Sequence, residues 1–117
     1  MYDIKPEVFA QLKEIAGVTI SDAYPKDFSM LPHISFYEPS NNDPLGIKNS
    51  PLTAVAIQVD IWHNKSTGTL AAEVDVRMNS IGLRRDFSAD VPDPSGIKHK
   101  TMRYRGVVDS RSGRVTQ

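Results

Sequence analysis

The sequence predicts an α+β fold, with a four- to five-stranded mixed or antiparallel sheet and two helices packed on one face. Apolar residues alternate along residues 54–62, as in a strand with one buried side. Apolar residues recur at helical spacing along residues 67–81. The order helix, strands, helix, strands is typical of the α+β class. A single domain is expected over residues 1–109, and residues 110–117 are expected to form a flexible polar tail.

The first helix is expected at residues 5–16. Pro6 suits the first turn of a helix, where the missing amide costs nothing. Val8, Leu12 and Ile15 form one apolar stripe, and Gly17 is expected to end the helix.

Two strands and a loop are expected next. Val18 and Ile20 begin a short strand that Pro25 stops, and Ile34 and Phe36 share one side of a strand at residues 33–38. Residues 39–51, PSNNDPLGIKNSP, contain three Pro, three Asn and one Gly, which predicts a long polar loop. Loops of this length often carry function.

The central unit is the clearest feature of the chain. Its strand has one fully apolar face, formed by Val55, Ile57, Val59 and Ile61. Polar residues 64–66 break the strand, and Ser66 or Thr67 is expected to accept hydrogen bonds from the first amides of the following helix. That helix buries one stripe and ends at Gly82; the stripe is formed by Leu70, Val74, Met78 and Ile81.

Two further strands are expected after this unit. Leu83, Arg85, Phe87 and Ala89 alternate along residues 83–90. The turn VPDPSG then leads to the last strand, residues 98–109. One face of that strand is formed by Met102, Tyr104, Gly106 and Val108.

Composition excludes several classes of protein. The 117 residues include 14 basic and 14 acidic side chains, and this balance argues against a dedicated nucleic-acid binder. The absence of Cys excludes disulfides and thiolate chemistry. No apolar run approaches the roughly 20 residues of a membrane span, and the N-terminus has no signal-peptide pattern.

No catalytic, cofactor-binding or metal site is predicted. The His residues, at 33, 63 and 99, lack the short spacings of zinc motifs, and His99 lies between two lysines. The sequence offers no nucleophile elbow and no Ser beside a plausible base. Its glycines are scattered and form no phosphate-binding loop.

Two groups of residues are candidates for an interface. Trp62 points to the side of the central strand that carries Gln58 and Asp60, so it is either covered by a loop or used in an interface. A basic cluster follows the last two strands and is read as a solvated face or a surface for an acidic partner, or alternatively for a phosphate backbone; its arginines are Arg84, Arg85, Arg103 and Arg105.

The segments AIQVDIW, LAAEVDVRMNSIG and KHKTMRYRGVV together resemble the tail-completion proteins of siphophages, also called tail-to-head joining or tail terminator proteins. The likeness covers roughly residues 30–109. It implies an α+β virion protein, phage- or prophage-encoded, whose copies form a ring, usually a hexamer. The ring would cap the tail tube, bind the head connector or head-completion protein, and let DNA pass through its lumen.

The resemblance also implies a location and contact regions. The protein would lie at the head-proximal end of the virion tail, after assembly in the host cytoplasm, with no cofactor and no membrane partner. Loop residues are the expected contacts, namely Asn41, Asn42, Asp43, Leu45 and Ile47. The alternatives are a head-completion or connector subunit, a small metal-dependent enzyme using Asp60, His63 and His99, and a monomeric binding module using Trp62.

Overall fold

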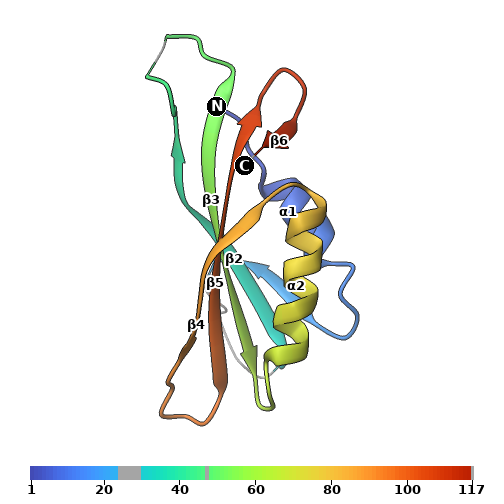
Figure 1. Ribbon diagram of the computed structural model, residues 1–117. Coiled ribbons are helices and arrows are strands. Elements are labelled where there is room, and N and C mark those ends of the chain that lie inside the picture. Colours follow the sequence, from blue (N-terminus) through green and yellow to red (C-terminus); the bar gives the residue numbers. More distant parts are fainter. Residues whose placement is uncertain (24–29, 47, 117) are drawn as a thin grey trace.

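The protein is an α+β domain in which two helices cover one face of a six-stranded mixed sheet (Figure 1). The computed structural model describes residues 1–23, 30–46 and 48–116. The elements in chain order are α1 (Lys5–Leu12), β1 (Thr19–Asp22), β2 (His33–Asn42), β3 (Leu52–His63), α2 (Gly68–Ser80), β4 (Arg84–Val91), β5 (Lys98–Asp109) and β6 (Arg114–Thr116). The strands lie in the order β1-β2-β3-β5-β4, and β6 pairs with β5. Only the β1–β2 pair is parallel among them.

Strand β3 forms the centre of the sheet, and its predicted alternation is confirmed. Its odd-numbered residues are buried beneath the helices, where Val59 lies opposite Phe36 of β2 and Met102 of β5. The helices contribute apolar side chains from two turns each, and those buried are Val8, Leu12, Val74 and Met78. The core therefore lies between one face of the sheet and both helices.

Helix α2 begins and ends near the predicted residues. Ser66 Oγ accepts a hydrogen bond from the Gly68 amide at 3.3 Å, whereas the Thr67 side chain makes no capping bond. Gly82 follows the helix with a φ of +90°, a conformation that favours glycine.

Helix α1 is shorter than predicted and ends at Leu12. The Glu14 amide bonds to the Gln11 carbonyl and the Ile15 amide to the Leu12 carbonyl, both at 3.1 Å, so the chain tightens into three-residue turns. This tightening turns Ile15 into the core, where it is buried.

Strand β2 is longer than predicted and includes the first residues of the expected loop. It runs to Asn42, with an irregularity in register between Tyr37 and Ser40. Pro39 lies in this irregularity, where a residue without an amide proton is tolerated. The connection to β3 is therefore residues 43–51 and not residues 39–51.

The predicted polar tail is also corrected, because residues 114–116 form strand β6. Gly113, with a φ of +72°, completes the turn that returns the chain along β5. Val115 then packs against the core, which extends the domain to Thr116. A side chain on Gly106 would meet Val115 at 2.6 Å, so glycine is needed where β6 pairs with β5.

A bulge in β4 changes the faces predicted for that strand. Arg85 lies opposite Tyr104, but Phe87 lies opposite Arg103, so one extra residue stands between them. Leu83 and Arg85 consequently lie on the helix side, and Phe87 lies on the other side. The alternation of residues 83–89 on a single face is therefore wrong.

The molecule is elongated, with extents of 48 × 25 × 23 Å. The β2–β3 hairpin extends past the helices at one end, and the β4–β5 hairpin extends at the other (Figure 1). Neither of the two helices in the described ranges is long and apolar enough to cross a membrane.

Candidate interaction surface

The face of the sheet opposite the helices, which we call the open face, carries most of the polar candidates. It is formed by alternate residues of every strand, including Gln58, Asp60 and Trp62 of β3 and their partners in β5. Figure 1 shows both helices on the other side of the sheet. Because no helix covers this face, the exposure of each of its side chains depends on contacts with side chains of the neighbouring strands.

Trp62 points to the open face, as predicted, and is buried there with an exposed fraction of 4%. Its ring stacks on His99, with ring centres 3.6 Å apart and planes inclined by 14°. Its indole nitrogen donates to Ser35 Oγ at 3.3 Å. Trp62 is thus buried within the monomer, but these contacts come from the neighbouring strands β5 and β2 and not from the predicted covering loop.

Asp60 and His99 form a polar pair beside this indole. His99 Nε2 lies 2.9 Å from Asp60 Oδ1, and both side chains are largely buried. Gln58 donates to Asp60 Oδ2 at 3.4 Å and accepts from Arg103 Nη2 at 2.9 Å. A chain of polar contacts therefore joins the arginine to the imidazole across β3 and β5.

Of the three proposed metal ligands, only Asp60 and His99 come together. His63 belongs to the odd-numbered side of β3 and so lies on the face opposite that of Asp60 and His99. In the part of the chain that the structure describes, no three His, Cys, Asp or Glu side chains are placed to hold a metal ion.

A Ser–His contact was missed by the sequence reasoning, which found no Ser beside a plausible base. Ser21 Oγ of β1 lies 2.7 Å from His33 Nε2 of β2. Only the parallel pairing of these strands brings the two residues together, and no short motif signals it. A nucleophile–base pair also needs oxyanion donors and a concave site. Three cavities of the described chain, of about 540, 430 and 180 Å³, are lined by other residues.

Three of the four predicted arginines gather on the open face. Arg84 of β4 lies directly opposite Arg105 of β5, and Arg103 lies two residues along the same strand. Arg105 forms an ion pair with Asp86. Arg85 lies instead on the helix side, 3.4 Å from Asp75 of α2, because adjacent residues of a strand point to opposite faces.

Exposed aromatic rings flank Arg103. Phe87, opposite it on β4, has an exposed fraction of 52%, and Tyr37 of β2 has one of 39%. The Nε atom of Arg103 is buried without a hydrogen-bond partner. Arginine and aromatic residues of this kind are enriched in protein–protein interfaces.

A small hollow lies beside the paired arginines, and we call it the arginine hollow. Its volume is about 180 Å³. It extends over β2, β3, β5 and β4, and its lining residues are Ser40, Asn42, Ala54, Val55, Arg84, Arg105, Gly106 and Val107.

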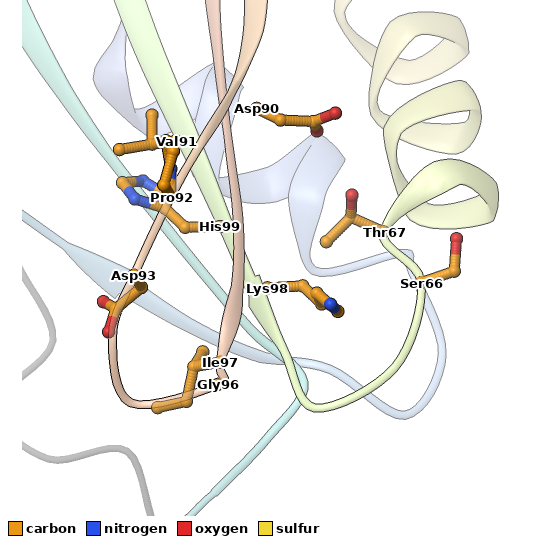
Figure 2. Close-up of a pocket in the computed structure, with 10 residues that line it drawn as sticks. All are labelled: Ser66, Thr67, Asp90, Val91, Pro92, Asp93, Gly96, Ile97, Lys98 and His99. Atoms are coloured by element: carbon orange, nitrogen blue, oxygen red, sulfur yellow. The ribbon is translucent and has the colours of Figure 1, made fainter.

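A larger cavity of about 540 Å³ lies between the β4–β5 hairpin and the turn that leads into α2 (Figure 2). Lys98 extends toward the turn that carries Thr67, and Asp90 lines the same space. Asp90 is paired with Lys100 at 3.1 Å. The Ser95 hydroxyl and, to a smaller extent, the Ser95 backbone amide donate hydrogen bonds to Asp93, and these bonds lower the pKa of Asp93 from its ordinary value. The lining of this cavity therefore contains both acidic and basic side chains, and no single ligand charge is favoured.

A third cavity, of about 430 Å³, lies between α1, the end of α2 and the turn into β6, and Ile4, Gly82 and Val115 are among its lining residues. Its lining also includes Glu7 and Arg114, which carry opposite charges, and the Glu7 carboxylate accepts a hydrogen bond from the Tyr2 hydroxyl.

The predicted loop contacts have separate positions. Asn41 donates to the Tyr2 carbonyl at 3.0 Å, so it joins β2 to the N-terminus. Asn42 is exposed and lines the arginine hollow. Asp43 Oδ1 accepts from the Leu45 and Gly46 amides, both at 3.1 Å, and Leu45 is exposed. Ile47 lies outside the described residues.

No family model matches the chain, and no curated protein matches it in sequence. The resemblance to tail-completion proteins stays a prediction that rests on the quoted segments.

Proposed function

We propose that this protein is a structural assembly subunit of a phage or prophage tail. Its copies form a ring that ends the tail tube and joins it to the head connector. The partners are further copies of the chain, the tube protein and the connector protein, while DNA passes through the lumen without sequence-specific contact. The hexameric number comes from the family resemblance alone.

The observation that carries the proposal is the open face with its arginines and exposed aromatic rings. The helices cover the other face of the sheet, so they leave the arginines and exposed rings of the open face accessible to a partner. A ring requires a head-to-tail contact between two different surfaces of each subunit. The elongated shape, with a hairpin at each end, provides separate surfaces for such contacts.

Strand edges are less suited to that contact than the open face. Among residues 1–23, 30–46 and 48–116, the outer edges of β1, β4 and β6 and the part of β2 beyond Phe36 have no neighbouring strand. β1 and β6 have only four and three residues, β4 and β2 each contain a register irregularity, and β2 also contains Pro39. Bulges and proline discourage strand addition. The proposal therefore places the subunit contact on side chains of the open face.

The test has two readouts. The first is mass in solution across concentration, with and without tail tubes, where ring-sized species are expected. The second is complementation of a phage lacking this protein, read as the yield of joined particles by electron microscopy. Replacing the three arginines of the open face, Arg84, Arg103 and Arg105, with Gln should lower that yield, more so at low salt than at high salt, because salt screens exposed charges.

Arg77→Gln on helix α2 is the matched control, since it removes an arginine from the helical layer. Full yield from the three-arginine variant would mean that these arginines form only a solvated face. Loss of the protein from the tail, with retention in the head, would favour the head-completion alternative.

A further inference from the structure

The arginine hollow contains a like-charge pair that the subunit alone does not balance. Arg84 and Arg105 lie directly opposite each other on neighbouring strands. Like charges in this arrangement destabilise a sheet. Asp86 pairs with Arg105, whereas Arg84 has no ion pair among the residues that the structure describes. The group as a whole therefore carries one positive charge in excess.

The size of the hollow restricts what can occupy it. Its volume of about 180 Å³ is below the roughly 300 Å³ at which pockets for whole small molecules begin. It is several times the roughly 30 Å³ that a water molecule occupies in the liquid. A single functional group of a larger partner fits this space better than a complete metabolite does.

The chemistry of the lining selects an oxyanion. The planar guanidinium group of Arg84 presents paired donors that match a carboxylate, and Arg105, whose Nε donates to Asp86, adds its terminal Nη donors. Ser40 and Asn42 line the opposite side and supply further polar hydrogens. Ala54 contributes apolar surface, which strengthens a charge interaction by excluding water.

We propose that the arginine hollow binds the carboxylate of an acidic side chain from a partner polypeptide. The single excess charge matches a carboxylate and not a dianionic phosphate, and Asp86 would repel a polyanion. The identity of the partner as a neighbouring ring subunit rests on the proposed function. The carboxylate specificity of the hollow does not.

The experiment is an NMR titration of the isotope-labelled chain with acetate, following the backbone amide signals of Ala54, Gly106 and Val107, which line the hollow and are present in every variant. These signals should shift and saturate in the millimolar range. The double variant Arg84→Gln/Arg105→Gln should lose at least tenfold in acetate affinity. The double variant to Lys should fall between the two, since it keeps the charges and loses the planar donors.

Arg85→Gln is the control, because it alters a neighbouring arginine that lies on the other face. It should bind acetate as the parent does. Absence of saturable shifts in the parent, or equal shifts in the double Gln variant, would overturn the site. Tighter binding of inorganic phosphate than of acetate would overturn the carboxylate assignment.

Mass measurements on the same variants separate this inference from the proposed function. If the parent chain binds acetate but forms no ring, even on tail tubes, the carboxylate site stands and the proposed ring is refuted. If the double Gln variant no longer binds acetate but still forms rings, the neighbouring ring subunit is not the partner of the hollow. Loss of both acetate binding and ring formation in the double Gln variant supports both proposals.

Discussion

Replacing Tyr104 with Phe tests how helix α2 is attached to the sheet. Tyr104 of β5 is fully buried, and its hydroxyl donates to Asp75 Oδ1 of α2 at 2.8 Å. The change removes this bond and leaves the ring in place. The expected result is a folded protein of lower stability, because one hydrogen bond to a charged group is lost.

The magnitude follows from the exposure of the acceptor. A hydrogen bond to a charged group contributes roughly 1.5–3 kcal/mol to stability. The Asp75 side chain is about one-third exposed and also contacts Arg85, so water replaces part of the lost interaction. We therefore expect a loss of about 1.5 kcal/mol at the lower end of that range, which corresponds to a decrease in Tm of about 6 °C for a chain of this length.

The same residue predicts a dependence of stability on high pH. Burial, followed by the hydrogen bond to Asp75, raises the pKa of Tyr104 above its ordinary value of 10.0. Since the folded-state pKa is the higher one, the stabilisation is complete below pH 10 and is lost as the pH rises beyond it. The expected slope is about 1.4 kcal/mol per pH unit for one proton. The Phe variant should lack this contribution.

The assay is urea denaturation at pH 7 and at steps above pH 9, with thermal melting as a second measurement. Tyr37→Phe is the control, because Tyr37 is a partly exposed tyrosine on the open face and should change stability by less than about 0.5 kcal/mol. A loss below about 0.5 kcal/mol in Tyr104→Phe would refute the reasoning. An unchanged alkaline slope in that variant would do the same.

Four further outcomes are expected. Val59→Asp should cost several kcal/mol by burying an unpaired carboxylate, and cooperative melting near the parent temperature would refute the register of β3. Gly106→Ala should destabilise the protein by about 1–3 kcal/mol, because the added methyl meets Val115. Adding Val115→Ala to that variant should restore part of the lost stability, and no restoration would contradict the contact. A fluorophosphonate probe should not label Ser21, and elemental analysis should find no stoichiometric metal; labelling abolished by Ser21→Ala would establish a nucleophile. Shortening residues 43–51 to a Gly-Ser turn should preserve the fold and abolish joining of heads and tails, whereas full particle yield would remove this loop from the mechanism.

The local pattern of apolar residues was sufficient to predict strand β3 and helix α2. The alternation of β3 and the apolar stripe of α2 depend on neighbours within a few residues, so Val59, Val74 and Met78 were placed correctly in the core. The ends of helices and strands were predicted less accurately, because they depend on contacts with segments distant in the sequence. Helix α1 stops early as Ile15 turns into the core.

The candidate surface was predicted in part, for the same reason. The basic cluster was visible in the sequence, but the pairing register of β4 on β5 decides that Arg84 faces the open side and Arg85 faces α2, and the bulge after Arg85 places Phe87 on the open side. The Ser21–His33 contact required the parallel pairing of β1 with β2, which no local signal encodes.

The sequence by itself determined the α+β class, the buried face of the central strand and the position of its helix, because side-chain periodicity is a local property of the backbone. The tertiary structure alone decided the addition of β6, the burial of Trp62 against His99 and the arginine pair beside the hollow. These features depend on strand order and on pairing register, and both are set by contacts between residues that are distant in the sequence.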